Sequence, residues 1–265
     1  MDDMTGRSSE PEPEGPHDGA AALVDPRPPE ALRDSAGRIF GDRLPLAIRY
    51  AEMLMTDGVV RGLIGPREAP RIWDRHLLNC AVVSELIPQD ARVADVGSGA
   101  GLPGIVLAVA RPDLSVILVE PLARRTAFLL EAATALGLDR TTVVRARAEE
   151  CAPSRGMPRF ELADVVTARA VAPLDRLTAW CLPLAAKGGR VLALKGESAV
   201  EEVEAHRDVI ARLGGDSPVV RLCGVGLLEP PTTVIEITRA RLVEGRSPSS
   251  QDRKGHRAQR ARSRH

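Results

Sequence analysis

The chain has 265 residues, of which 44% are hydrophobic, so it can form one sizeable core. Its 36 basic residues balance its 36 acidic residues, so the net charge indicates no particular class of partner. No apolar run of about 18 residues could span a membrane, and the acidic N-terminus lacks the apolar segment of a signal peptide, which favours a cytoplasmic protein without membrane contacts. The four cysteines are widely spaced and form no C-x-x-C pair, so we expect reduced structural thiols and no metal site.

The first 90 residues fall into two parts. Residues 1–36 are rich in Pro, Glu, Asp, Gly and Ala, which cannot bury enough apolar surface to offset the entropy of ordering, so a disordered acidic segment is expected there. Residues 37–90 carry apolar side chains at three- and four-residue spacing. This spacing predicts helices over 43–55 and about 70–86 that pack on the domain that follows.

Strands and helices then alternate across residues 91–240. Strands are predicted over 92–97, 115–120, 141–147, 162–170, 189–196, 218–225 and 232–240, and helices over 104–112, 122–137, 173–185 and 199–214. This alternation predicts an α/β, Rossmann-like fold with a mostly parallel seven-stranded sheet covered by helices on both faces. The last two strands are joined too briefly for a right-handed crossover, so one of them must run antiparallel.

The last segment, residues 241–265, is predominantly basic and ends in DRKGHRAQRARSRH. Its composition predicts a disordered tail. Two interpretations remain open, a merely solvated tail or an arm that holds nucleic acid through its phosphates.

The first strand of the sheet leads into a glycine-rich loop, VADVGSGAGLPGI, at residues 93–105. The loop has no Lys, which excludes a Walker-type phosphate loop. A dinucleotide fingerprint fits poorly, because the strand already ends two residues before Gly99. The pattern Asp95-x-Gly97-x-Gly99-x-Gly101 instead resembles motif I of class I S-adenosylmethionine-dependent methyltransferases. Glycine lets such a ligand approach the backbone closely, and we expect Asp95 to stabilise its positive charge directly or through water.

Two further strand ends are expected to complete this cofactor site. Glu120 ends the second strand, where a carboxylate can accept both ribose hydroxyls of a nucleoside. Ala148 and Glu149 follow the third strand and are expected to flank the adenine. The antiparallel strand near the C-terminus favours a methyltransferase sheet over a dehydrogenase sheet.

The sequence lacks motifs that are typical of certain methyl acceptors, and this reduces the range of possible acceptors. The fourth strand ends in VVTARAVAPL rather than in the Pro-Pro-aromatic motif of adenine methylation, and no Pro-Cys or Thr-Cys loop offers a nucleophile for pyrimidine C5. A guanine N7 needs no general base, so its methylation requires only positioning, and we assign no catalytic residue. A small-molecule methyltransferase, with the N-terminal helices as a lid, remains the alternative.

Four stretches together resemble a known family. RIWDRHLLNC (71–80), DVGSGAGLPGI (95–105), ARA (168–170) and ALKG (193–196) are similar to the bacterial small-subunit rRNA guanine-N7 methyltransferase G family, also called glucose-inhibited division protein B. The resemblance covers about residues 40–240. It implies transfer of a methyl group from S-adenosylmethionine to N7 of guanine 527 in 16S rRNA, by a monomer acting on the rRNA or the small ribosomal subunit. It also implies cofactor contacts by Gly97, Leu102, Ala148, Glu149 and Arg169.

Basic side chains near the site are the candidates for RNA contacts. Arg169 and Lys195 end neighbouring strands, so both are expected at the sheet's carboxyl edge, with Arg169 near the cofactor carboxylate or an RNA phosphate. The other candidates are Arg75, His76, Arg124 and Arg125. His76 could instead pack beside Trp73, and the paired arginines could simply lie at a solvated helix start.

Overall fold

The computed structural model describes residues 25–152, 160–170 and 172–242. Most of the two termini expected to be disordered therefore lies outside the described residues. Residues 30–36, however, are helical: a turn at Glu30–Leu32 leads into α1 (Arg33–Phe40). Ala36 and Phe40 are buried in the core, which offsets the entropy of ordering, so the expected disordered segment was too long at this end.

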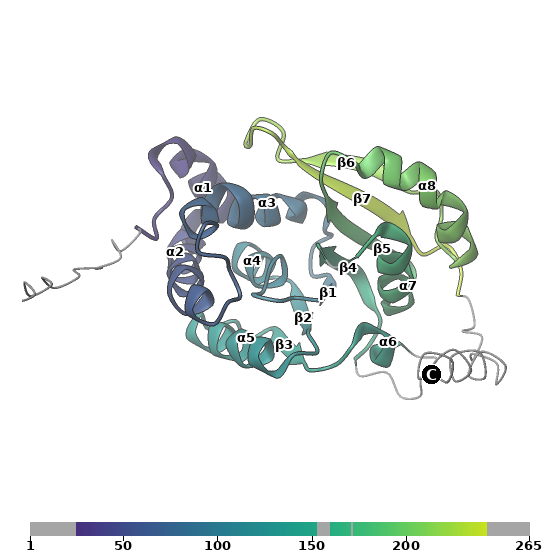
Figure 1. The fold of residues 1–265 in the computed structure, drawn as a ribbon, viewed down its shortest axis with the longest axis horizontal. Coiled ribbons are helices and arrows are strands. Elements are labelled where there is room, and N and C mark those ends of the chain that lie inside the picture. The colour runs from purple at the N-terminus through teal and green to yellow at the C-terminus, as the bar shows by residue number, and fades with distance from the viewer. Residues whose placement is uncertain (1–24, 153–159, 171, 243–265) are drawn as a thin grey trace, which may run out of the picture.

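Seven strands form one twisted sheet in the centre of the molecule (Figure 1). Their order is β3-β2-β1-β4-β5-β7-β6, and β7 runs in the direction opposite to the other six. The strands are β1 (Arg92–Val96), β2 (Ser115–Val119), β3 (Thr141–Val144), β4 (Ala163–Arg169), β5 (Ala185–Lys195), β6 (Val219–Cys223) and β7 (Thr232–Thr238). The predicted fold class, with its antiparallel strand near the C-terminus, is confirmed.

Helices cover both faces of the sheet (Figure 1). On one face, α4 and α5 pack together with the helices that precede the sheet, and on the other α6, α7 and α8 form a second apolar cluster. The bounds are α2 (Leu44–Met53), α3 (Leu78–Ala81), α4 (Gly104–Ala110), α5 (Ala123–Ala135), α6 (Ala148–Cys151), α7 (Leu174–Cys181) and α8 (Ala199–Arg212). The predicted third strand was three residues too long at its C-terminal end, and the short helix α6 that follows it was not predicted.

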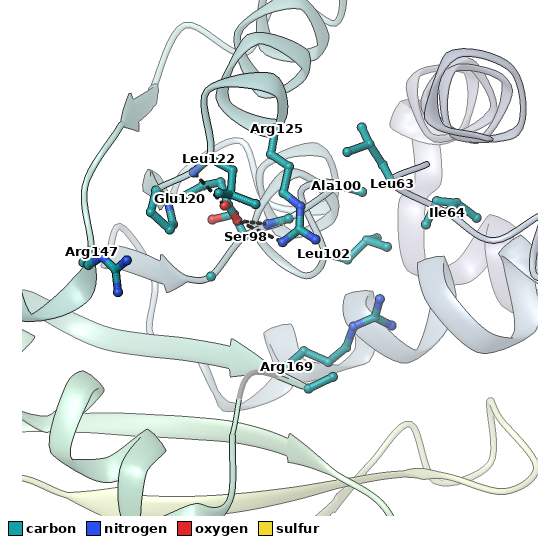
Figure 2. A pocket seen from close by; sticks show the side chains of 14 residues that line it. Leu63, Ile64, Ser98, Ala100, Leu102, Glu120, Leu122, Arg125, Arg147 and Arg169 are labelled. Atoms are coloured by element: carbon teal, nitrogen blue, oxygen red, sulfur yellow. Dashed lines mark hydrogen bonds and ion pairs between the residues drawn. The ribbon is translucent and has the colours of Figure 1, made fainter. Parts of the chain in front are cut away.

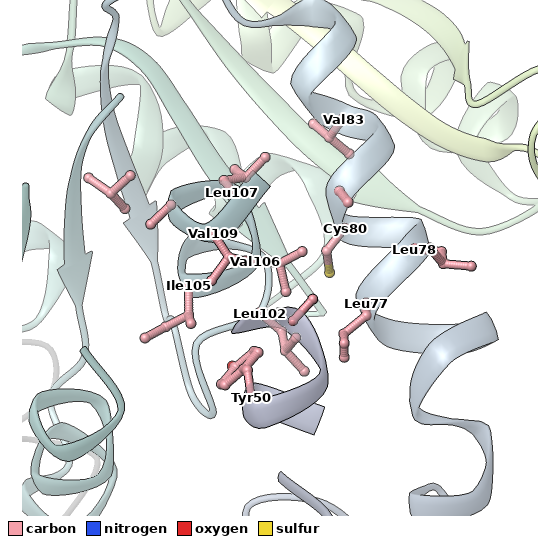
Figure 3. Close-up of a cluster of buried hydrophobic side chains, with 14 of the residues drawn as sticks. Tyr50, Leu77, Leu78, Cys80, Val83, Leu102, Ile105, Val106, Leu107 and Val109 are labelled. Carbon is pink, nitrogen blue, oxygen red and sulfur yellow. The ribbon is translucent and has the colours of Figure 1, made fainter. Parts of the chain in front are cut away.

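The helices before the sheet are part of the core. Short 3-10 and π-helical turns extend α2 to Gly58 and place α3 inside a helical run over residues 69–86. Figure 3 shows Tyr50 and Leu77 from this region against Ile105 of α4. All three side chains are at most 1% exposed and belong to one cluster with the inward residues of β1 and β2. The N-terminal helices are therefore fixed relative to the loop between β1 and α4.

This topology creates a crevice at one place on the sheet edge. The chain moves outward from β1 to β2 and β3 and then returns to β4 on the other side of β1. The connecting helices consequently lie on opposite faces of the sheet, so the carboxyl ends of β1 and β4 are left open.

Because the N-terminal helices share the core, truncating one of their buried side chains should destabilise the whole chain. Leu77→Ala is expected to lower the free energy of unfolding by about 2–5 kcal/mol. Val60→Ala, at a side chain that is 86% exposed, is the control and should change it by less than about 0.5 kcal/mol. Urea unfolding monitored by fluorescence and by circular dichroism measures both. A Leu77→Ala variant as stable as the control would show that these helices pack loosely.

Candidate functional site

A cavity of about 630 Å³ opens at the carboxyl ends of β1 to β4. Figure 2 shows Arg147 and Leu63 on opposite sides of it, with Glu120 and the β1–α4 loop between them. The lining residues come from the segments that follow β1, β2 and β3, from the end of β4 and from the N-terminal region: Leu63, Ile64, Gly97, Ser98, Gly99, Ala100, Leu102, Glu120, Pro121, Leu122, Arg125, Arg147, Arg169 and Ala170. The crevice expected from the topology is therefore the place where the predicted motif residues meet.

The glycine loop forms the floor of this cavity. Gly97, Gly99 and Gly101 all have positive φ angles, of 70°, 58° and 95°, which side chains rarely tolerate. The amides of Gly97 and Ser98 donate to the carbonyl of Val119 at 2.9 and 3.2 Å, which fixes the loop to β2. Gly97 and Gly99 line the cavity, so ligand atoms can approach their backbone directly.

Gly101, by contrast, serves packing. It does not line the cavity, and a Cβ built there would lie 2.7 Å from the Tyr50 hydroxyl. That hydroxyl donates a hydrogen bond to the carbonyl of Ala100 at 2.5 Å, which links α2 to the loop. The cofactor contact expected of Gly101 is replaced by a contact with the N-terminal helices.

Asp95 lies beneath the loop rather than in the cavity. Its side chain is 0% exposed, and its carboxylate accepts hydrogen bonds from the Thr167 hydroxyl at 3.0 Å and from the Gly104 amide at 3.1 Å. Burial raises the pKa of Asp95 to about 6, although hydrogen bonds from Ser98, Thr167 and Gly104 oppose this shift. Asp95 therefore holds the loop, α4 and β4 together, and its expected influence on a cationic ligand, directly or through water, stays a prediction.

Glu120 faces the cavity from the end of β2, as the sequence predicted. Its side chain accepts hydrogen bonds from the Gly99 amide and the Leu122 amide, both at 3.0 Å. Arg125 lies at 3.7 Å and contributes a positive charge. Each carboxylate oxygen has a second lone pair, so Glu120 can accept two further hydrogen bonds from a ligand such as a ribose.

Arg169 reaches the cavity from the end of β4, also as predicted. Its Nη1 donates to Nδ1 of His76 at 3.1 Å and lies 3.4 Å from the carbonyl of Arg75. The other ring nitrogen of His76 is 3.0 Å from Glu68. Both nitrogens of His76 are thus engaged and its side chain is only 13% exposed, so the expected RNA contact by His76 is not supported.

Leu102 lines the cavity, as the resemblance implied, but most of the other basic residues predicted to contact RNA do not. Arg125 lines the cavity, whereas Arg75 and Arg124 are exposed beyond it. Lys195 is 12% exposed and donates to Glu202 at 2.7 Å and to the carbonyl of Ala172 at 3.1 Å. Two of its three N–H donors are therefore engaged, and Glu202 offsets its charge.

After β3, the residue that lines the cavity is one position before the predicted pair. Ala148 is buried in α6 and Glu149 is exposed, and neither lines the cavity, whereas Arg147 does. Sequence analysis also missed Leu63 and Ile64. Had the third strand been predicted to end closer to the N-terminus, Arg147 would have been included among the candidate residues. No local sequence pattern indicates Leu63 or Ile64, because the packing of the N-terminal helices brings them to the cavity.

Residues 25–152, 160–170 and 172–242 contain neither a metal-binding cluster nor a membrane-spanning helix. There, no three His, Cys, Asp or Glu side chains gather closely enough to hold a metal ion. None of the helices in these ranges is long and apolar enough to cross a membrane.

Comparison with known proteins agrees with this geometry. The fold is similar to a solved Methanococcus maripaludis protein described as a candidate S-adenosyl-L-methionine-dependent methyltransferase, with a TM-score of 0.50, 15% identity, and coverage of 73% of this chain and 94% of that one. The sheet order and the glycine loop thus define a methyltransferase fold of class I. A family model described as rRNA small subunit methyltransferase G matches residues 43–226.

Relatives with that name align over most of their length. The protein called Ribosomal RNA small subunit methyltransferase G from Salinispora tropica is 66% identical over 226 residues, which cover 85% of this chain and 93% of the relative. The protein of the same name from Streptomyces coelicolor is 53% identical over 212 residues, covering 80% and 85%. The chain belongs to the rRNA small subunit methyltransferase G family.

The buried position of Asp95 predicts a characteristic pH dependence of stability. Its folded pKa of about 6 lies above its ordinary value of 3.8, so between these values the folded protein binds a proton that the unfolded chain lacks. The contribution of Asp95 to stability is therefore fully present below about pH 4 and is lost as pH rises through about 6. This difference corresponds to about 3 kcal/mol.

Asp95→Asn should remove this pH dependence. Relative to the variant, the wild-type protein should lose stability as pH rises from 4.5 to 8, as measured by urea unfolding across that range. Asp139→Asn, at an exposed aspartate, is the control and should track the wild type. A constant difference between wild type and Asp95→Asn would show that Asp95 does not titrate in this range.

Proposed function

We propose that this chain transfers the methyl group of S-adenosylmethionine to N7 of guanine 527 in 16S rRNA of the small ribosomal subunit. The observation that carries the cofactor assignment is the carboxylate of Glu120, which lines the cavity beside the glycine loop and is fixed by the Gly99 amide. Family membership supports the small-subunit rRNA as the substrate. The choice of N7 and of guanine 527 rests on the sequence resemblance.

The cavity fits S-adenosylmethionine on several points. Its volume of about 630 Å³ lies in the range of small-molecule sites. Glu120 offers acceptors for the two ribose hydroxyls, and Leu102 and Leu122 supply apolar surface. Arg169 supplies a positive charge for a carboxylate. When bound, this cofactor supplies an electrophilic methyl group on a sulfonium.

The lining residues suit an acceptor that needs no general base. Among the described lining residues, only Glu120 carries a side chain that could accept a proton, and it already accepts hydrogen bonds from two amides. The lone pair of guanine N7 is free at neutral pH, so the protein has only to place it in line with the methyl group. Arg125, Arg147 and Arg169 give the cavity rim the positive charge that binds RNA phosphates.

A small-molecule methyltransferase is the second candidate, because Leu63 and Ile64 add an apolar wall from the N-terminal region.

Labelled S-adenosylmethionine separates the two candidate functions when it is offered with small subunits that lack this methyl group, with naked 16S rRNA and with a metabolite extract. Borohydride reduction and aniline cleavage then locate N7-methylguanine in the RNA. We expect cleavage at guanine 527. Label only in small molecules, or at another base, would contradict the proposal.

The ribose contact proposed for Glu120 predicts a loss of affinity. Glu120→Ala should weaken S-adenosylmethionine binding by about 1.5–3 kcal/mol, since hydrogen bonds to a charged acceptor are lost, and Glu120→Gln should lose less because an amide oxygen remains. Isothermal titration calorimetry measures both, with NAD as the ligand control that should not bind. Wild-type affinity in Glu120→Ala would place the ribose elsewhere.

The close approach of the cofactor to the loop can be tested with matched glycines. Gly99 and Gly137 have φ angles of 58° and 61°, and a Cβ at either would meet no atom closer than 3.7 Å. Alanine at either position should therefore cost a similar amount of stability, about 1–2 kcal/mol. Only Gly99→Ala should also weaken S-adenosylmethionine binding, by tenfold or more, because Gly137 lies away from the cavity. Equal affinities in the two variants would argue against contact at Gly99.

A further inference from the structure

Three side chains from separate segments form a continuous hydrogen-bonded chain that ends in the cavity. Glu68 precedes the turn at Ala69–Arg71, His76 lies in the turn at Trp73–Leu77, and Arg169 ends β4. Glu68 and the Nε2 atom of His76 are 3.0 Å apart, and Nδ1 of His76 lies 3.1 Å from the Arg169 guanidinium. Of the three, Arg169 alone lines the cavity, so the other two can act on a ligand only through it.

The direction of each hydrogen bond follows from the chemistry of the groups. A guanidinium can only donate, so Nδ1 of His76 must accept and carries no proton. The neutral ring then carries its proton on Nε2 and donates to the carboxylate of Glu68. Burial and the charge of Arg169 lower the pKa of His76, while Glu68 opposes this shift. The ring is therefore neutral at pH 7 and held in one tautomer.

This arrangement fixes Arg169 without neutralising it. Among the described residues, Arg169 forms no ion pair with a carboxylate, because its acceptors are a neutral imidazole and a main-chain carbonyl. A carboxylate in the place of His76 would hold the guanidinium equally well but would cancel its charge. The interposed ring keeps Glu68 one side chain away, so the full positive charge is available to an anion in the cavity.

We propose that Glu68 and His76 are positioning residues that aim Arg169 at an anionic group of a bound ligand, a proposal that rests on the proposed function of the same cavity. The anion is a carboxylate or a phosphate. It comes either from the amino-acid part of the cofactor or from the RNA backbone. Glu68 sets the tautomer of His76, and His76 sets the orientation of the guanidinium.

Calorimetry with two ligands tests the proposal. S-Adenosylhomocysteine carries the amino-acid carboxylate, whereas 5′-methylthioadenosine lacks it. If the anion belongs to the cofactor, Glu68→Ala and His76→Leu should weaken S-adenosylhomocysteine binding by about fivefold to thirtyfold and leave methylthioadenosine binding within twofold. Glu68→Gln should restore wild-type affinity, because its amide oxygen still accepts from Nε2. Asp74→Ala is the control: Asp74 pairs with Arg71 in the same helical run and is similarly exposed.

If the anion belongs to the RNA, the same variants should bind both nucleosides normally. They should instead raise KM for small subunits several-fold at unchanged kcat. Either pattern supports positioning. Equal losses of affinity for both nucleosides would overturn the proposal, because they would indicate that the site has collapsed. Wild-type values in every assay would also overturn it, because they would show that the ligand does not depend on these contacts.

Nitrogen-15 NMR of the imidazole tests the geometry without any ligand, and so separates this proposal from the proposed function. We expect Nδ1 unprotonated and Nε2 protonated in the wild type and in Glu68→Gln, and a tautomer mixture in Glu68→Ala. The charged groups facing the ring are Glu68, Arg169 and Arg75. Acidification should protonate Nδ1 and break its bond to Arg169. If the anion belongs to the cofactor, binding of S-adenosylhomocysteine should therefore fall at low pH in the wild type but not in Arg169→Ala. A proton on Nδ1 at pH 7 would overturn the proposal.

Discussion

The geometry of the cavity depends on one buried carboxylate. Asp95 accepts hydrogen bonds from the first amide of α4 and from the Thr167 hydroxyl on β4, so one side chain joins β1, the following helix and the neighbouring strand. Burial of this charge is unfavourable, as its raised pKa shows, and the hydrogen bonds compensate for it. Gly104 is required here, since a Cβ would lie 2.8 Å from the carboxylate.

The loop held in this way lines the cavity with the backbone of Gly97 and Gly99 and with Leu102. Its amide at Gly99 fixes Glu120, so the acceptor at the end of β2 and the floor of the cavity are set by the same hydrogen bond. The N-terminal helices close the arrangement from the other side, through Tyr50 and through the wall formed by Leu63 and Ile64. They are therefore part of the site as well as of the core.

Much of this could be predicted from the sequence, because periodicity and strand ends are local properties. The alternation of strands and helices gave the sheet, and the glycine spacing with Glu120 gave the position of the cavity. What depends on tertiary packing could not be predicted. The sequence shows that Asp95 is acidic but not that it is enclosed, and that Lys195 is basic but not that Glu202 neutralises it.

The arginines illustrate the same distinction. Arg125, Arg147 and Arg169 line the cavity, while other basic residues that looked equivalent in the sequence lie outside it or are paired. Arg147 and Arg169 reach the cavity beyond or at strand ends, whereas Arg125 reaches it from α5 and has Glu120 as a partner 3.7 Å away. For Arg169 the partner is a neutral imidazole, which preserves its charge for a ligand.

A crystal structure with S-adenosylhomocysteine bound tests the central claim most directly. The proposed function predicts both ribose hydroxyls within hydrogen-bonding distance of the Glu120 carboxylate, the nucleoside backed by Gly97 and Gly99, and the sulfur directed toward the side of the cavity formed by Leu63, Ile64 and Arg169. A ligand bound away from the glycine loop, or a Glu120 carboxylate that makes no contact with the ribose, would contradict it.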